Sequence, residues 1–277
     1  HAGPADLTAD MEGMRVQGQG VLAEIPVRAN VEMDFRNGPN GQVLSRESLT
    51  GRADVRQLAG LGFDLREYAE GTAQIEARNE TRRGQASRVT LRGDLRDARL
   101  RVDMLGWQKP RGAAGTAEAV LRIQGDQVQA LEQLRIEAGD GLLRARGNAF
   151  RNGWPERLDL QEVVFGATRL AGDVRAPRSP GGEWQVSLRG PSLDLTRALS
   201  DRGGEDSPPT APEPPRGGPT YALDWRFDRV ILGPRRQSGA LTGRARLDAA
   251  GVLHQAEADA RFGNAGASFR LTQEGTR

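Results

Sequence analysis

The residue types that most often carry out chemistry are scarce in this chain. Its 277 residues include two histidines, His1 and His254, one lysine, Lys109, and no cysteine, which excludes disulfides, thiolate metal sites and cysteine nucleophiles. His254 falls on the apolar side of an expected strand, where a lone imidazole is usually structural. No spacing in the sequence matches a GxSxG nucleophile elbow, an HExxH zinc site or a phosphate-binding loop around Lys109. We therefore expect a protein that is not an enzyme and uses no cofactor and no metal.

The charged residues are numerous but balanced in sign. Apart from Lys109, all of the 39 basic residues are arginines, and 37 acidic residues leave a net charge of +2. The two signs are interleaved along the chain, whereas nucleic-acid binding favours a patch of one sign. We expect no nucleic-acid partner and interpret the arginines as a solvated surface.

Apolar and polar residues alternate with a period of two over most of the chain. In the clearest segment, residues 27–35, alternate positions are apolar and the positions between them are polar or charged. The segment ends at the turn-forming sequence NGPNG, residues 37–41. The alternation indicates antiparallel strands with one buried and one solvated face. It recurs at residues 73–78, 117–123, 169–176, 183–189, 221–228 and 241–247.

This pattern predicts an all-β fold, a long antiparallel meander curled into an open groove (a repeating β-groove) with one or two very short helices. The helices are expected near Asp54 and Asp194, either of which can cap a helical turn. A closed sandwich would need a second sheet with large side chains about 10 Å away. Here the apolar residues are mostly Ala, Val and Leu, and aromatic residues make up only 5% of the chain. Bound hydrocarbon chains could cover the apolar side of an open trough instead.

Composition divides the chain into four segments. Residues 1–13 are expected to be a disordered or partial N-terminal segment, and residues 14–200 the main β-groove segment. Residues 201–219, rich in Pro, Gly and acidic residues, predict a flexible loop or linker because they bury too little apolar surface to offset the entropy of ordering. Residues 220–277 are expected to continue the sheet.

No stretch approaches the ~18 consecutive apolar residues of a membrane span, and the first residues lack the apolar centre of a signal peptide. The chain begins at His1. We therefore expect an excised or processed segment, with an anchor or export signal upstream of it.

Three sequence blocks between about residues 45 and 200 resemble the AsmA-like superfamily of bacterial envelope proteins, in particular its YhdP branch. The blocks are ADVRQLAGLGFDLREYAEG from residue 53, LGWQKPRG from residue 105 and GPSLDLTRALS from residue 190. The most specific of them is the loop LGWQKP, with Leu105, Gly106, Trp107, Lys109 and Pro110. The resemblance implies a repeating β-groove fold, related to chorein-type lipid bridges, in a periplasmic segment of an inner-membrane-anchored protein.

The resemblance also implies a function in phospholipid transport to the outer membrane and in the homeostasis of that membrane. The expected partners are phospholipid acyl chains, the inner and outer membranes through regions outside this segment, and other envelope proteins. We hypothesise that the apolar side of the sheet shields the acyl chains. The expected lining residues are Val27, Ala29, Val31, Met33, Phe35, Ile75, Val89, Leu91, Leu121, Ile123, Val186, Leu188, Leu223 and Trp225.

Two other classes of function stay open from the sequence. A structural or assembly module, as in TamB-like relatives linked to outer-membrane protein insertion, would use sheet edges to pair with client strands. A glycan-binding or glycan-hydrolysing β domain would need exposed aromatic residues, for which Trp107 and Trp154 are the loop tryptophans available. A β-sandwich without a ligand is the remaining structural alternative.

Overall fold

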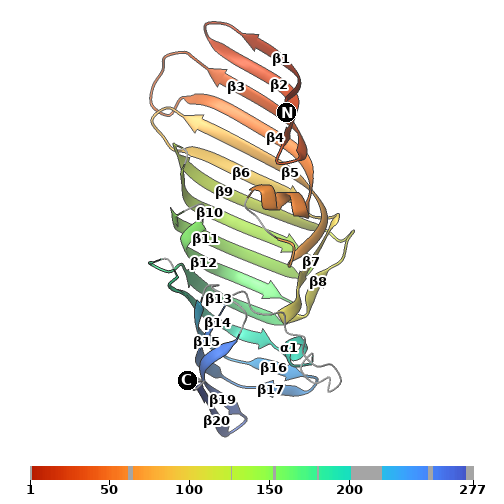
Figure 1. Ribbon diagram of the computed structural model, residues 1–277, viewed down its shortest axis with the longest axis vertical. Coiled ribbons are helices and arrows are strands. Elements are labelled where there is room, and N and C mark those ends of the chain that lie inside the picture. Colours follow the sequence, from red (N-terminus) through yellow and green to blue (C-terminus); the bar gives the residue numbers. More distant parts are fainter. Residues whose placement is uncertain are drawn as a thin grey trace. The chain divides into compact units, whose positions relative to one another are not determined.

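A computed structural model of the chain describes residues 2–61, 65–125, 127–151, 154–179, 181–200, 220–248 and 252–272. The fold is all-β, an open, unclosed sheet structure of mostly antiparallel strands, which confirms the predicted fold class (Figure 1). Three short helical segments accompany the strands in the described residues: η1 (Val55–Leu61), η2 (Asp103–Leu105) and α1 (Thr196–Ser200).

The chain separates into two compact units. Unit 1 consists of His1–Arg101 and Gln108–Trp154, and unit 2 of Val102–Trp107 and Pro155–Arg277. This division lies after Trp154 and differs from the boundary expected at residues 201–219, a segment that lies outside the described residues. Within residues 1–13, for which a disordered or partial segment is expected, a strand occupies Ala2–Ala9 and pairs with the strand that follows it.

Unit 1 contains nine strands that pair antiparallel one after another. In spatial order they are β1 (Ala2–Ala9), β2 (Gly13–Leu22), β3 (Ile25–Asp34), β4 (Val43–Asp54), β5 (Ala69–Arg82), β6 (Ser87–Asp94), β9 (Gly115–Gln124), β10 (Gln127–Ala138) and β11 (Gly141–Arg151). The short strand β7 (Ala98–Val102) pairs with the start of β5, and β8 (Trp107–Lys109) follows it in the chain.

Unit 2 contains a second run of neighbouring strands. In spatial order they are β12 (Trp154–Phe165), β13 (Thr168–Arg175), β14 (Glu183–Asp194), β15 (Thr220–Phe227), β18 (Leu241–Leu247), β19 (Leu253–Phe262) and β20 (Ala265–Thr272). The short strands β16 (Val230–Gly233) and β17 (Arg236–Ser238) form a hairpin in which β16 also pairs with the end of β14.

The pairing of β14 with β15 departs from a simple meander because these two strands are parallel. A parallel pair needs a connection of a dozen or more residues, whereas an antiparallel pair needs only a tight turn. Residues 195–219 connect the two strands, so the chain is long enough there to return in the same direction. The Pro- and Gly-rich composition noted in the sequence thus coincides with the one place in this run of strands where the pairing is parallel instead of antiparallel.

The register of the pairs places the apolar residues of unit 1 on one face. Residues directly opposite each other in adjacent strands project to the same side of a sheet. We refer to this side as the apolar face and to the other side as the charged face. One row across the apolar face runs Val16, Val31, Glu47, Asn79, Val89 and Leu121 from β2 to β9, and the next runs Gly18, Ala29, Leu49, Ala77, Leu91 and Ala119.

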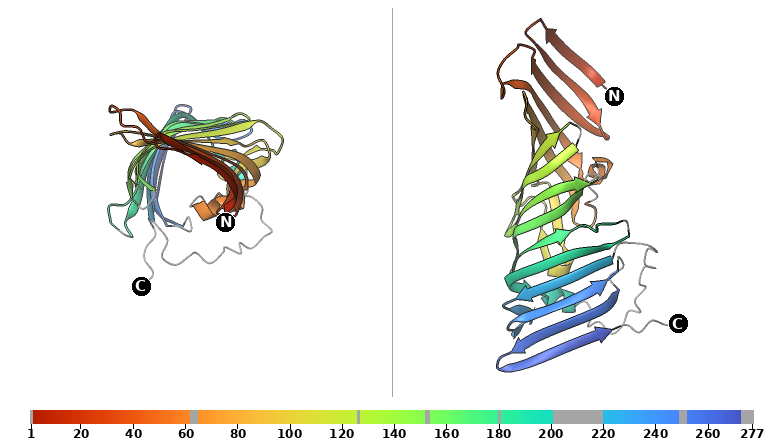
Figure 2. Two further views of the ribbon diagram at one scale, coloured as in Figure 1. Left: turned by 90° about the horizontal axis from the view of Figure 1, so that it is seen from above. Right: turned by 90° about the vertical axis from the view of Figure 1, so that its left-hand side faces the viewer.

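The short helix η1 shows which side of unit 1 is the inner one. Leu58 of η1 packs against a buried cluster of Ile25, Val27 and Ala53 on the apolar face. Figure 2 shows η1, in orange, on the inner side of the curved strands. In this part of unit 1 the apolar face is therefore the concave face.

Candidate functional site: an apolar face with a polar rim

The predicted lining residues of unit 1 share the apolar face. Val27, Ala29, Val31 and Met33 lie on β3, and the register aligns them with residues of the same parity on β4 and β5. Most of these side chains are half-buried, and Val27 is only 8% exposed. The remaining lining residues of this unit on the same face are Ile75, Val89, Leu91, Leu121 and Ile123.

The predicted lining residues of unit 2 also lie on one face. Val186 is directly opposite Leu223, and Leu188 is directly opposite Trp225. The Trp225 ring lies over Gly243, where a Cβ atom would come within 2.6 Å of the ring carbon Cζ2. The absence of a side chain at Gly243 therefore allows the indole to lie against the sheet.

Phe35 differs from the other predicted lining residues. Strand β3 ends at Asp34, so Phe35 lies in the connection to β4, where its backbone N–H donates to the carbonyl of Glu12. Its side chain is 51% exposed. The alternation in the sequence continues one residue beyond the end of the strand.

One row across the charged face alternates in sign from β2 to β6, and it consists of Arg15, Glu32, Arg46, Glu80 and Arg88. Arg15 donates to Glu32 at 3.1 Å, and Arg46 to Glu80 at 3.3 Å, across neighbouring strands. Such exposed pairs contribute about 0 to 1 kcal/mol each, so they favour solubility and register more than stability. Hollows on this face are spaces between side chains of both signs, as among Arg92, Glu118, Arg135 and Glu137 in unit 1. A single-sign cradle of the kind that nucleic acid requires is not formed there.

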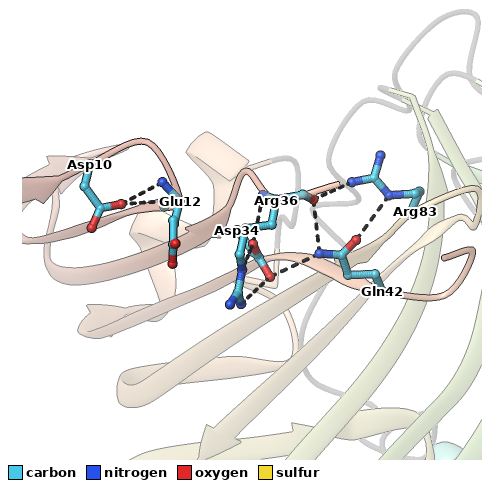
Figure 3. Close-up of polar contacts among 7 residues, drawn as sticks. Asp10, Glu12, Asp34, Arg36, Gln42 and Arg83 are labelled. Atoms are coloured by element: carbon cyan, nitrogen blue, oxygen red, sulfur yellow. Dashed lines mark hydrogen bonds and ion pairs between the residues drawn. The ribbon is translucent and has the colours of Figure 1, made fainter. Parts of the chain in front are cut away.

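A network of polar side chains lies at one rim of unit 1, where β3 ends and β4 begins (Figure 3). Arg36 binds Asp34 with Nε and Nη2, both at 2.9 Å. Gln42 donates to Asp34 Oδ2 and to the Arg36 carbonyl, both at 3.2 Å, and Arg83 from the β5–β6 turn donates to Gln42 Oε1 and the Arg36 carbonyl. The Arg36 hydrogen bonds hold the pKa of the Asp34 carboxyl well below its usual range.

A second pair of an arginine and an aspartate two residues before it lies where β4 leads into η1, as Arg36 and Asp34 do at the end of β3. Arg56 donates to Asp54 Oδ1 through both its backbone N–H, at 2.9 Å, and Nε, at 3.0 Å. These hydrogen bonds lower the pKa of Asp54 to about 2, and the side-chain hydrogen bond from Arg56 has a larger effect than the one from its backbone N–H. The sequence prediction that Asp54 begins a short helical turn is confirmed, since η1 starts at Val55.

The loop motif LGWQKP forms a structural corner. Gly106 adopts a left-handed conformation, with φ +61°, that ends η2, and a Cβ atom there would lie 2.8 Å from Cβ of Arg197. Trp107 is buried and its ring centroid lies 4.7 Å from that of Phe165. Leu105 is half-buried and Pro110 is exposed. Trp107 is therefore not available as an exposed aromatic for a glycan, and the side chain of Trp154 lies outside the described residues.

Lys109 is the most deeply buried polar side chain of the motif, with 1% of its surface exposed. Its Nζ donates to the carbonyls of Leu95 and Ala98 at 2.7 Å, and to those of Pro110 and Arg96 at 3.2 and 3.4 Å. Burial lowers the pKa of Lys109, while the Asp94 and Asp97 carboxylates act in the opposite direction. The ammonium group of Lys109, on β8, therefore links this strand by hydrogen bonds to the segment that leads from β6 into β7.

Five polar residues that the sequence analysis did not single out lie on the apolar face of unit 1. They are Ser45 and Glu47 on β4, Asn79 and Thr81 on β5, and Ser87 on β6, and we refer to them as the polar island. A signal was present in the sequence, because these positions continue the apolar phase of their strands. Only the register shows that these five polar residues are neighbours on the sheet.

The comparisons with known proteins return no relative. No protein-family model matches the chain, and neither does any curated protein or solved structure. In the part of the chain that the structure describes, no group of His, Asp and Glu residues is placed to hold a metal ion. None of the described helices is long and apolar enough to cross a membrane.

Replacement of Lys109 tests the role of the loop motif in the fold. We expect Lys109→Met to lower the free energy of unfolding by about 2 to 3 kcal/mol, because hydrogen bonds from a charged donor to buried carbonyls are lost. Chemical denaturation followed by circular dichroism measures this change. The control Arg92→Met removes a cation from the charged face and should change stability by at most about 0.5 kcal/mol. Equal effects of the two substitutions would contradict a special role of Lys109.

Acid titration tests the contribution of the Asp34–Arg36 and Asp54–Arg56 pairs to stability. The pKa values of Asp34 and Asp54 are lower in the folded chain than the ordinary 3.8, so their contribution to stability is present above about pH 4 and is lost as the pH falls towards 2. We expect Asp54→Asn to weaken the dependence of Tm on pH in this window. Asp6→Asn, at an exposed carboxylate that makes no hydrogen bond within the described residues, should leave that dependence unchanged. A pH profile of Asp54→Asn identical to that of the wild type would refute the prediction.

Proposed function

We propose that this chain shields phospholipid acyl chains along its apolar face and is not an enzyme. The observation that carries the proposal is the half-buried apolar face itself, which the strand registers continue from strand to strand within each unit. Most of its side chains are neither covered, as in a core, nor charged, as on the opposite face. The charged face on the other side supplies the solubility that such a sheet requires.

The physical basis of the proposal is the cost of exposing lipid tails to water. Each methylene group removed from water contributes about 0.8 kcal/mol, so an apolar lining lowers the barrier for a tail that leaves a membrane. Such a surface shields lipid without any covalent step. A lipid gradient or an energised partner would have to supply the direction of transport.

The cellular setting in this proposal comes from the resemblance of residues 45–200 to the YhdP branch of the AsmA-like superfamily. On that basis we propose a periplasmic segment of an inner-membrane-anchored protein that contributes to lipid transport to the outer membrane. Its partners would be the two membranes, reached through regions outside this segment, and other envelope proteins. The alternating charges argue against nucleic acid as a partner.

Lipid co-purification tests this proposal directly. We expect native mass spectrometry of the chain purified from a Gram-negative host to detect bound phospholipid. Val31→Asp and Ile123→Asp each place a carboxylate on the apolar face and should reduce lipid occupancy at least about tenfold, because burying an unpaired charge beside a lipid tail is costly. Gln17→Asp, on the charged face of β2, should retain lipid. The absence of lipid from the wild type, or its persistence in both apolar-face variants, would overturn the proposal.

A second candidate function rests on an open sheet edge. Among the described residues β20 pairs only with β19, and Phe269 and Leu271 on it are 56% and 38% exposed. An unpaired edge strand can add a strand from another chain through backbone hydrogen bonds. An assembly module for outer-membrane proteins, similar to TamB, would use such an edge.

Proline substitutions distinguish this second candidate. Neighbouring N–H groups of a strand point to opposite sides, so one of Ser268→Pro and Phe269→Pro removes a donor from the free edge without breaking the bonds to β19. If the edge binds clients, that variant should lose crosslinking to an unfolded outer-membrane barrel protein while retaining its folded circular dichroism spectrum. Undiminished crosslinking in both variants would count against edge pairing.

A further inference from the structure

The polar island interrupts the apolar face at a defined place, the rim where β4 begins and β5 ends. Glu47 is directly opposite Val31 on one side and Asn79 on the other, and Asn79 is directly opposite Val89. One step further from the rim, the neighbouring row is apolar, with Leu49, Ala77 and Leu91 across the same strands. A polar group at the rim therefore adjoins an apolar track.

The side chains of the polar island form hydrogen bonds with one another, and one of their acceptor atoms has no partner. Ser45 Oγ donates to Glu47 Oε1 at 3.1 Å, and Asn79 Nδ2 approaches Glu47 Oε2 at 3.4 Å. Thr81 Oγ1 and Ser87 Oγ are 2.9 Å apart. Asn79 Oδ1 is buried and has no hydrogen-bond partner. A buried acceptor without a partner loses the hydrogen bond that water would give it, so a donor from a ligand would stabilise it.

Glu47 is distinguished from the other carboxylates of this sheet by its surroundings. In the described registers of β2 to β6 and β9, it is the one ionisable side chain on the apolar face. On the charged face, Glu32, Glu76 and Glu80 each bind an arginine, whereas Glu47 forms no ion pair with any described residue. A half-buried carboxylate without a cation is a site where a cation from outside binds favourably.

We infer that the polar island binds the protonated primary amine of an amphiphile, with an ethanolamine phospholipid as the ligand class. An ammonium group has three N–H donors, and the island offers the Glu47 carboxylate, the free Asn79 Oδ1 and the Ser45 hydroxyl oxygen as acceptors. The acyl chains would lie along the row of Leu49, Ala77 and Leu91. This inference rests on the proposed function, because it names the lipid headgroup that the same face selects.

Vesicles of matched acyl composition test this headgroup preference. The purified protein is incubated with vesicles that contain equal amounts of phosphatidylethanolamine, phosphatidylcholine and phosphatidylglycerol, and bound lipid is counted by native mass spectrometry. Phosphatidylcholine retains the positive charge but has no N–H donor, and phosphatidylglycerol has no cation. We expect phosphatidylethanolamine to exceed each of the others about tenfold, as one or two hydrogen bonds to a charged group allow.

Two variants separate the island from the rest of the sheet. Glu47→Gln removes the charge with little change in shape and should abolish the preference while total lipid occupancy stays within about twofold of wild type. Glu80→Gln removes the same charge from the charged face of β5 and should keep the preference. Bound lipid without a headgroup preference, or a preference unchanged in Glu47→Gln, would overturn this inference alone. Failure of every lipid to bind the wild type would overturn the proposed function instead.

Discussion

The structure depends on one constraint, which is that neighbouring strands pair in a register that keeps their side-chain alternation in phase. A slip of one residue in any pair would turn every side chain of that strand to the opposite face. In unit 1 the row through Val31 and Leu121 keeps this phase from β2 to β9. The same register brings the arginines and acidic residues together on the charged face. Their cross-strand ion pairs there also oppose a shift of the strands by one residue.

Small residues allow the apolar face to remain a surface instead of becoming a packed core. Gly18, Ala29 and Ala77 occupy the same row as Leu49 and Leu91, so large and small side chains alternate across the strands. Where cover is present, as at Ile25 beneath η1, exposure falls to zero. Elsewhere most of the predicted lining residues are half-buried.

The charged and polar residues lie in three different settings that the composition does not distinguish. Arginines of the charged face such as Arg15 and Arg46 pair with acidic residues of neighbouring strands, and each of these contacts is weak. Lys109 is buried and bonds to backbone carbonyls, so it stabilises a corner of the fold. Glu47 has neither an arginine nor a turn to stabilise, and its position on the apolar face is the basis of the proposed headgroup site.

The alternation of residue types was sufficient to predict the all-β class, the open sheet and the face shared by Val27, Val31, Ile75 and Leu121, because side-chain direction in a strand follows directly from position parity. Capping chemistry also located η1 after Asp54 and α1 after Asp194.

Pairing partners required the tertiary structure, because hydrogen-bonded neighbours in a sheet can be distant in sequence. The parallel pair β14–β15 depends on such contacts, and the burial of Lys109 depends on the carbonyls of Leu95 and Ala98 in a neighbouring segment. The polar island is the clearest case. Glu47 and Asn79 are separated by η1 and a loop in sequence, and only the register of β4 with β5 makes their side chains neighbours.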